Sequence, residues 1–179
     1  MHIMDILQNS IRAGASQIKV EIEEDIPGKT LTLEINDNGR GMSEMDLSHA
    51  TDPFFTTRTT RRVGLGLPLL KQNCERTGGH FSLESQPGTG TRVRAEFVTK
   101  HPDRLVLGDI PGVVMLTVAA NPSIAIHYRH QSDGGSYQFL SDEVRQSLPG
   151  ISLENAGVFS YLKEMISEHL SEIGVSLYA

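Results

Sequence analysis

The first part of the chain passes from a helical to a strand-like hydrophobic pattern. Residues 2–13 carry apolar side chains at steps of three and four, which predicts an amphipathic helix that ends near Gly14. Residues 17–23 alternate apolar and charged side chains, as is typical of a half-buried strand. A second alternating run at 31–35 follows the turn DIPGK, so we expect the two strands to form a hairpin.

The same order, a helix followed by a hairpin, recurs further along the chain. Residues 67–77 are expected to form a helix that is entered through Pro68 and stopped by Gly78 and Gly79. The runs HFSLES and TRVRAEFV, separated by the turn QPGTG, predict a second hairpin. Residues 1–99 therefore predict an α+β fold, a two-layer α/β sandwich with helices on one face of a sheet.

A segment rich in proline, glycine and charge at 100–112 predicts a linker. We therefore expect a domain at 1–99 and a small C-terminal α+β extension at 113–179. In the extension, strands are expected at 113–119 and 124–129, and the turn SDGGS precedes a further strand, YQFL.

The last segment has the period of a long amphipathic helix. We expect this helix at about 152–173, with Ser152 as its N-cap. Its predicted buried stripe comprises Phe159, Leu162, Ile166, Leu170 and Ile173.

Composition narrows the class of protein. The chain has 179 residues and a net charge of −6, which argues against broad nucleic-acid binding because that needs a basic face. No apolar run reaches the roughly 18 residues of a membrane span, and MHIMDILQNS lacks the pattern of a signal peptide. The single cysteine, Cys74, excludes an internal disulfide and is expected in the core. A cytoplasmic location is therefore expected.

Several short motifs follow one another in an unusual order. Asp5 and Asn9 lie one turn apart on the first predicted helix, and INDNGRGM at 35–42 ends a strand on an acid followed by two glycines. DPFFTTR, GLGL and GTGT come later. Each motif alone has an ordinary interpretation, such as a solvated helix face or a turn, but their joint occurrence in this order is improbable by accident.

Together these motifs resemble the ATP-binding domain of the GHKL superfamily, which includes gyrase-type topoisomerases, the heat-shock chaperone ATPase, histidine kinases and MutL-type mismatch-repair ATPases. DILQNSIRAGAS resembles the N box, INDNGRGM the G1 box, DPFFTTR the F box of histidine kinases and VGLGLPLLKQNCERTGG the G2 box. PGTGTRVRAEF resembles the closing Gly-Thr element. The resemblance covers residues 2–98 and implies the Bergerat-type ATP-binding fold.

By this resemblance Asp37 accepts a hydrogen bond from the exocyclic amine of adenine. Such an acid would be left unpaired by a base without that donor, so it selects adenine. Gly39 and Gly41 let the backbone approach the ring, and Met42 is expected to pack on the purine. Thr91 resembles the threonine that supports the acid and a water beside the base.

The resemblance also implies a phosphate end. Asn9 resembles the magnesium ligand, and Mg²⁺ prefers oxygen ligands. Gly64 and Gly66 begin a helix whose amides suit phosphate oxygens. Residues 43–63 would form a lid over ATP, from which Arg58 could reach the phosphates; the alternative is an exposed lid charge. The remaining ATP-site residues implied by the resemblance are Ala13, Leu65 and Leu67.

Position 5 bears on the reaction class. Hydrolysing relatives have a glutamate there as general base, and histidine kinases usually have asparagine, whereas this chain has Asp5. Asp5 is therefore either a general base or part of the magnesium shell. Three hypotheses stay open: a kinase-like module that phosphorylates a partner protein in trans, a weak ATPase or nucleotide-gated switch, and an interaction module that binds no nucleotide.

Other histidines offer only weak signals. HPDRL, starting at His101, has a faint likeness to a phosphoacceptor motif and is otherwise a linker with an exposed histidine. His127 and His130 suggest either a metal pair or a partly exposed strand edge. The whole chain is also similar to small standalone histidine-kinase-like proteins loosely associated with iron-hydrogenase gene clusters, which suggests an unidentified, hydrogenase-related protein partner. The C-terminal strands are candidates to extend the sheet.

Overall fold

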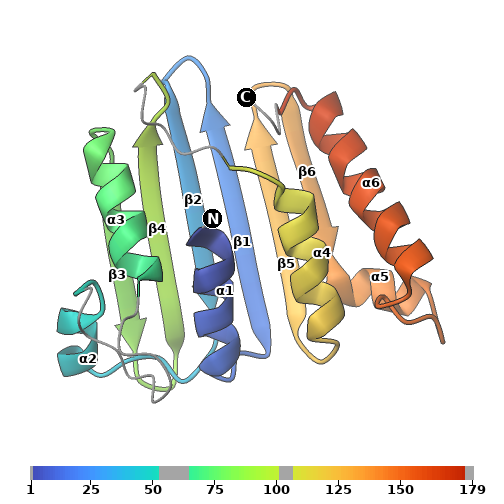
Figure 1. Cartoon of the computed structure of the whole chain (residues 1–179), viewed down its shortest axis with the longest axis horizontal. Helices are drawn as coiled ribbons and strands as arrows, with labels where there is room; N and C mark the ends of the chain where they lie inside the picture. Colours follow the sequence, from blue (N-terminus) through green and yellow to red (C-terminus); the bar gives the residue numbers. More distant parts are fainter. Residues whose placement is uncertain (1, 53–64, 101–106, 176–179) are drawn as a thin grey trace.

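The computed structural model describes residues 2–52, 65–100 and 107–175. They form a six-stranded sheet in the order β3-β4-β2-β1-β5-β6. The strands are β1 (Gln17–Asp25), β2 (Thr30–Asp37), β3 (His80–Gln86), β4 (Gly90–Val98), β5 (Ala125–Ser132) and β6 (Gly135–Leu140). The helices are α1 (His2–Arg12), α2 (Glu44–His49), α3 (Gly66–Arg76), α4 (Ile110–Ala120), α5 (Ser141–Ser147) and α6 (Ala156–Glu172). Helices α1, α3, α4 and α6 cover one face of the sheet (Figure 1).

The N-terminal half confirms the predicted α+β sandwich. β1 and β2 form the first hairpin, with Ile18 opposite Asp37, and β3 and β4 form the second. β2 also pairs with β4, so the two hairpins join into one antiparallel unit. Alternation gives each strand one apolar face, and α1 and α3 cover that face, as Figure 1 shows.

The strand predicted at 113–119 is wrong, because α4 occupies this stretch and begins inside the predicted linker. The Asp109 side chain accepts a hydrogen bond from the amide of Gly112 at 2.9 Å, and Pro111 stands in the first turn. Almost all of α4 is buried, so its apolar residues show no amphipathic period. Periodicity cannot distinguish such a buried helix from a buried strand.

The rest of the C-terminal segment agrees better with the predictions. β5 and β6 are present, whereas α5 was not predicted. Helix α6 begins at Ala156, and its N-cap is Asn155 rather than Ser152, because the Asn155 side chain accepts from the amide of Gly157 at 2.9 Å. The predicted stripe of α6 faces inward: Leu162, Ile166 and Leu170 are buried, and Phe159 and Ile173 are partly buried.

Arg145 on α5 ties together the elements of this segment. Its guanidinium donates to the carbonyl oxygens of Val118 at 3.2 Å, Asn121 at 3.3 Å and Ile124 at 3.1 Å. These carbonyls lie at the C-terminal end of α4 and in the turn that follows, where helix carbonyls lack intrahelical donors. Arg145 therefore supplies a cationic cap that the last turn of α4 itself does not contain.

The C-terminal segment shares the sheet and the core of the N-terminal half. β5 runs parallel to β1, with Ile18 paired to Ile126, so the C-terminal strands extend the sheet as expected. One hydrophobic cluster includes residues from both halves, such as Leu7, Ile18 and Ile166. The division of the chain into a domain, a linker and an extension stays a prediction about separable units.

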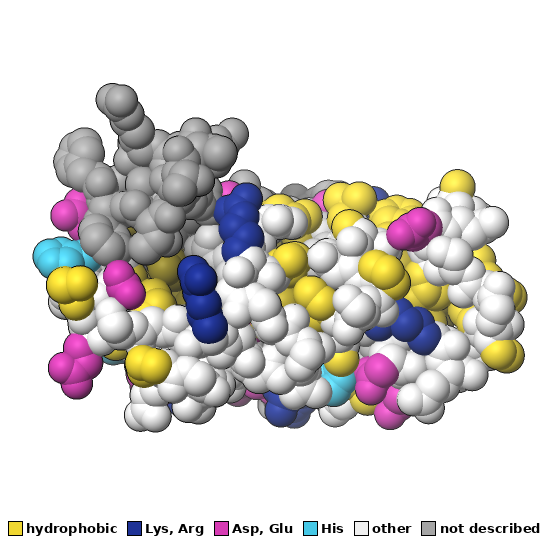
Figure 2. Space-filling view, turned by 90° about the horizontal axis from the view of Figure 1, so that it is seen from below, with side chains coloured by type: hydrophobic (Ala, Val, Ile, Leu, Met, Phe, Trp, Pro, Cys, Tyr) yellow, Lys and Arg dark blue, Asp and Glu magenta, His cyan; other side chains and the backbone are white. Residues whose placement is uncertain are grey.

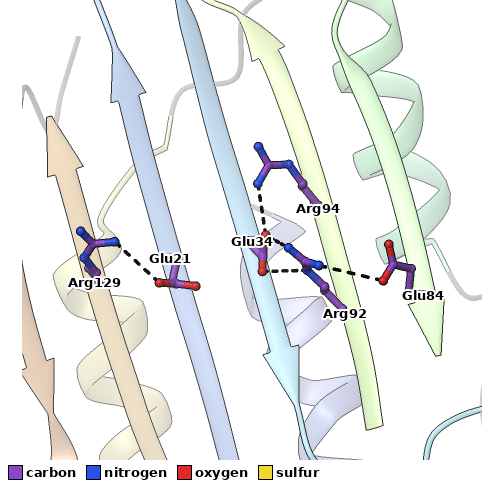
Figure 3. Close-up of polar contacts among 6 residues, drawn as sticks. All are labelled: Glu21, Glu34, Glu84, Arg92, Arg94 and Arg129. Carbon is purple, nitrogen blue, oxygen red and sulfur yellow. Dashed lines mark hydrogen bonds and ion pairs between the residues drawn. The ribbon is translucent and has the colours of Figure 1, made fainter. Parts of the chain in front are cut away.

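The face of the sheet away from the helices is polar (Figure 3). Glu34 accepts two hydrogen bonds from Arg92, at 2.8 and 3.0 Å, and one from Arg94 at 3.2 Å. Partial burial acts to raise the pKa of Glu34, but the bonds and charges of Arg92 and Arg94 outweigh it, so this pKa lies below its ordinary value. Cross-strand ion pairs thus link Glu34 on β2 to Arg92 and Arg94 on β4 across this face.

None of the helices that the structure describes is long and apolar enough to cross a membrane. Some large apolar side chains are nevertheless exposed in the C-terminal half, among them Leu116, Ile151 and Tyr161. Figure 2 shows hydrophobic side chains spread over this part of the molecule when it is viewed from the end of the sheet. Scattered exposed apolar residues are ordinary on a protein surface.

Candidate functional site

Three of the predicted site residues lie along one side of α1: Asp5 and Asn9 are in the helix, and Ala13 directly follows its last residue. Asp5 is exposed, whereas Asn9 and Ala13 are half-buried. The amide of Ala13 donates to the carbonyl of Asn9 at 2.9 Å, which continues the helical path beyond the last helical residue. Steps of four residues place side chains on one side of a helix, and Asp5 and Ala13 are about 12 Å apart along the axis. The residues therefore form a row with two distinct ends.

Asp37 lies at the Ala13 end of this row. It is the last residue of β2, is 6% exposed, and its carboxylate is held by two donors. Ser10 donates its hydroxyl to Oδ2 at 2.6 Å, and the amide of Gly39 donates to Oδ1 at 2.9 Å. A carboxylate has about four acceptor positions, so Asp37 retains acceptor capacity for a ligand.

The glycine loop (residues 37–42) packs closely against its neighbours. A Cβ on Gly39 would lie 2.8 Å from Cβ of Ala13, and the next amide, that of Arg40, donates to the Ala13 carbonyl at 2.9 Å. Gly41 has φ of 66°, and a Cβ there would lie 1.9 Å from the carbonyl oxygen of Gln86. Both glycines therefore have a packing role that the sequence analysis did not predict.

The second hairpin closes the other side of the glycine loop. Thr91 is paired with Asp37 in the sheet, and its hydroxyl lies 2.9 Å from that of Ser85. Ser85 donates to the carbonyl of Gly90 at 2.8 Å and accepts from the amide of Met42 at 2.9 Å. Because Ser85 has one proton, Thr91 is the donor in their contact. Ser85 thus links Met42 to Thr91.

At the Asp5 end of the row, α1 meets the start of α3. A Cβ on Gly66 would lie 2.8 Å from Cβ of Asp5, and 3.8 Å from its Oδ2. The N-cap residue of α3, Leu65, makes no side-chain capping bond, and the first turn contains no acid. The first amides of a helix lack intrahelical acceptors and carry partial positive charge. The amides of Gly66 and Leu67 therefore suit an anion beside Asp5.

Some predicted site residues cannot be placed. Arg58 and Gly64, with most of the DPFFTTR motif and residues 61 and 62, lie outside the described residues, as does His101. The structure thus brings Asp37, Gly39, Gly41, Met42 and Thr91 together at one end of α1. It brings Asp5 and Gly66 together at the other end, with Asn9 between. Ser10 and Ser85 were not predicted, and nothing in the local sequence distinguishes them.

His127 and His130 form neither a metal pair nor a strand edge. β5 lies between β1 and β6 in the sheet, so it is not an edge strand. The side chains of His127 and His130 have different partners. His127 contacts Asp142 at 3.0 Å, whereas His130 is fully buried and contacts the Tyr128 hydroxyl at 2.7 Å and Glu24 at 2.8 Å. Residues three apart on a strand point to opposite faces. No group of three or more His, Cys, Asp or Glu side chains that could hold a metal ion occurs among the residues that the structure describes.

Cys74 confirms its predicted place in the core. It lies within α3 and is completely buried. Burial raises the pKa of the Cys74 thiol to about 11. Because the thiolate is the reactive form, this side chain does not supply a nucleophile to the site.

The sequence matches the family described as histidine kinase-, DNA gyrase B-, and HSP90-like ATPase over residues 2–101. It is 29% identical over 116 residues to the non-motile and phage-resistance protein of Caulobacter vibrioides, covering 60% of this chain and 14% of that protein. It is 35% identical over 106 residues to the C4-dicarboxylate transport sensor protein DctB of Pseudomonas aeruginosa, covering 59% and 16%.

A shorter relative is the sensor histidine kinase YxdK of Bacillus subtilis, 29% identical over 103 residues, which cover 55% of this chain and 32% of that kinase. The matches thus span less than a third of the length of these curated relatives. Among solved structures, the N-terminal domain of a DNA repair protein aligns with a TM-score of 0.50 and 16% identity, covering 78% of this chain and 50% of that one. That likeness concerns the fold alone.

Proposed function

Because the chain belongs to the histidine kinase-, DNA gyrase B- and HSP90-like ATPase family, we propose that it binds Mg-ATP along α1 and transfers the γ-phosphate to a partner protein in trans. One observation carries this proposal: the buried carboxylate of Asp37 on β2 lies at one end of α1, and the start of α3, whose N-cap residue Leu65 makes no side-chain capping bond, lies at the other. A purine with an amine donor fits the first, and phosphates fit the second.

At the base end, Asp37 accepts a hydrogen bond from the 6-amino group of adenine. The backbone at Gly39 and Gly41 forms one side of the base pocket, and Met42 packs on the purine. Thr91, opposite Asp37 in the sheet and bonded to Ser85, supports the base end from β4. We therefore expect the site to bind adenine nucleotides more tightly than guanine nucleotides, because guanine carries an acceptor oxygen where adenine carries a donor.

At the phosphate end, Asn9 would hold Mg²⁺ through its amide oxygen, and Asp5 would add a carboxylate oxygen or act on water. These are the oxygen ligands that Mg²⁺ prefers, and few protein ligands suffice because Mg²⁺ keeps waters and phosphate oxygens in its shell. Bound Mg²⁺ would neutralise part of the phosphate charge. The backbone of Leu65, Gly66 and Leu67 donates to the phosphates. Gly64 and Arg58 are assigned to this end by the sequence resemblance alone.

Phosphotransfer requires a nucleophile from the partner. Its lone pair attacks the γ-phosphorus, and the bond from that phosphorus to the bridging oxygen breaks, so that ADP leaves with the electron pair. The acceptor is unidentified; a hydrogenase-related protein in the cytoplasm is our working candidate, resting on the sequence resemblance alone. The relative named as a sensor histidine kinase, YxdK, supports phosphotransfer as the first hypothesis.

A second function, slow hydrolysis, is favoured by the close approach of α1 at Asp5 to the start of α3, where a Cβ on Gly66 would lie 2.8 Å from Cβ of Asp5. Here Asp5 takes a proton from a water, whose oxygen attacks the γ-phosphorus while ADP leaves. Aspartate is one methylene shorter than the glutamate of hydrolysing relatives, so we expect turnover to be slow. Nucleotide-dependent closure without transfer would then regulate partner binding.

The test begins with titration calorimetry of Mg-ATP and Mg-GTP. We expect binding of ATP, weaker binding of GTP, and loss of the phosphate contribution when EDTA removes Mg²⁺. Equal affinity for both nucleotides, or no binding, would refute the site. Partners captured with ATP present and not without it are then incubated with γ-labelled ATP. Label on the partner supports transfer, whereas release of free phosphate alone supports the hydrolytic alternative.

A further inference from the structure

Ser10 is a buried hydroxyl on α1 that bonds outside its own helix. It is 2% exposed and donates to Oδ2 of Asp37 at 2.6 Å, across 27 positions of sequence. A hydroxyl in the middle of a helix usually bonds back to the carbonyl four residues earlier. Among the residues that the structure describes, Thr117 bonds in this way to Val113 and Ser167 to Lys163.

The hydrogen bond from Ser10 means that both oxygens of the Asp37 carboxylate accept a hydrogen bond from the protein. Gly39 fixes Oδ1 through its amide, and Ser10 fixes Oδ2 through its hydroxyl. The terminal torsion of an aspartate is broad, so one donor alone leaves the carboxylate plane free to swing. With both donors in place, the remaining lone pairs have fixed directions before any ligand arrives. A hydrogen bond from a ligand then costs less ordering.

We propose that Ser10 is a positioning residue that sets the base selectivity of the nucleotide site, acting through Asp37. The inference rests on the proposed function, since it assumes that Asp37 faces the 6-amino group of adenine. Ser10 therefore contributes to affinity only for bases that carry a donor at that position. A purely structural hydroxyl would affect all nucleotides equally.

The experiment compares two nucleotides with each variant. Calorimetry measures the affinity for Mg-ATP and for the magnesium salt of purine riboside 5′-triphosphate, which lacks the 6-amino group and adds no acceptor there. The variants are Ser10→Ala, which removes the donor, and Ser10→Thr, which keeps it. Ser132→Ala is the matched control, because Ser132 is also buried and donates to a carbonyl, that of Ile173, in the C-terminal half.

We expect the parent protein and Ser132→Ala to prefer ATP to the analogue by the same factor. Ser10→Ala should reduce that preference by about tenfold, equal to about 1.4 kcal/mol, with little change in affinity for the analogue. Ser10→Thr should restore most of the preference. Circular dichroism checks folding, and if Ser10→Ala does not fold, Ser10→Cys provides a weak donor of similar size and should give a reduced preference.

One outcome overturns the inference while the proposed function stands: Ser10→Ala weakens both nucleotides equally or neither. Equal affinity of the parent for both nucleotides would overturn the inference together with the assignment of Asp37 to the 6-amino group. Failure of the parent to bind either nucleotide would instead refute the proposed function. The two failures are distinguishable because the parent protein is measured in the same series.

Discussion

Buried polar side chains have different surroundings in the two halves of the sheet. In the C-terminal half, the ring nitrogens of His130 both have protein partners, Tyr128 and Glu24, and the ring is completely buried. In the N-terminal half, Asp37 has two donors yet keeps acceptor positions, and it lies beside a loop of close-packed glycines. Both ring nitrogens of His130 are thus used by contacts within the protein, whereas the carboxylate of Asp37 can still accept a hydrogen bond from a ligand.

The comparison separates polar groups that serve the fold from those that serve a ligand. Burial alone does not make this distinction, since both His130 and Asp37 are buried. What differs is the hydrogen-bonding capacity that remains after the protein contacts are counted. Substitutions in the two halves should therefore affect different measurements, and the predictions below begin with the largest expected effect.

Gly41→Ala should destabilise the protein most and disrupt the glycine loop. The new Cβ would lie 1.9 Å from a backbone oxygen at a positive φ, so the backbone itself must move. We expect a loss of about 4 kcal/mol in the free energy of unfolding, measured by urea denaturation. Gly150→Ala is the control, because Gly150 also has a positive φ but no atom within 4 Å of the added Cβ. Equal losses would contradict the packing argument.

Asp37→Ala should weaken ATP binding by about 100-fold, or about 2.7 kcal/mol, because the charged acceptor at the base end is removed. Calorimetry gives the affinity and thermal unfolding gives the stability. Asp109→Ala is the control: Asp109 also accepts from a backbone amide and from a side chain, Lys163, but caps α4. Loss of ATP binding in the control, or retention in Asp37→Ala, would contradict the distinction between the two halves.

His130→Ala should give the reverse result. Removal of the ring leaves the buried Tyr128 hydroxyl unsatisfied and opens a cavity, so the free energy of unfolding should fall by about 2 kcal/mol. ATP affinity should stay within a factor of two of the parent value. His80→Ala, at an exposed position on β3, should change neither quantity. A loss of ATP affinity in His130→Ala would contradict the prediction, because it would show that a buried side chain of the C-terminal half contributes to ATP binding.

Asp5→Asn tests the hydrolytic alternative. If Asp5 is a general base, phosphate release should fall by about tenfold while ATP affinity is retained, since the amide cannot accept the proton. A phosphate-release assay and calorimetry on the same preparation separate the two quantities. Glu75→Gln, an exposed acid on α3, serves as the control. Unchanged release would remove Asp5 from this role.

Glu34→Gln should have the smallest effect, and one that depends on pH. The lowered pKa of Glu34 means that its ion pairs stabilise the folded state above the ordinary value of 4.5 and are lost as the pH falls through the lower folded-state pKa. The parent should therefore exceed the variant by less than about 1 kcal/mol at pH 7, and this difference should shrink at acid pH. Glu84→Gln, more exposed, should show no such trend.

The two hairpins of the N-terminal half were predictable because β1, β2 and β4 each bury one apolar face, which produces a period of two. α4 was not, because a helix buried on nearly all sides carries apolar residues at most positions and shows no helical period. The helix start was nonetheless visible in Asp109 and Pro111, a capping residue followed by proline in the first turn. Helix α5 was missed because its short polar sequence has no marked period.

Some residues of the candidate site could likewise be predicted from the sequence and others could not. Asp37, Gly39 and Gly41 could be found because their motif is contiguous in the sequence. Ser10 and Ser85 could not, because each acquires its role from a partner on another element, Asp37 for the first and Met42 for the second. Contacts of this kind depend on sheet register and helix packing, which no local pattern encodes.

The parallel pairing of β1 with β5 has a consequence for synthesis on the ribosome. β1 emerges from the ribosome well before its outer neighbour β5, because β2, α2, α3, β3, β4 and α4 lie between them in the sequence. Until then, one side of β1 exposes unpaired amide and carbonyl groups, which can recruit strands from other nascent chains. Pairing with β5 therefore removes an exposed strand edge on which nascent chains can aggregate. A protein truncated before Ala125 should be prone to aggregate.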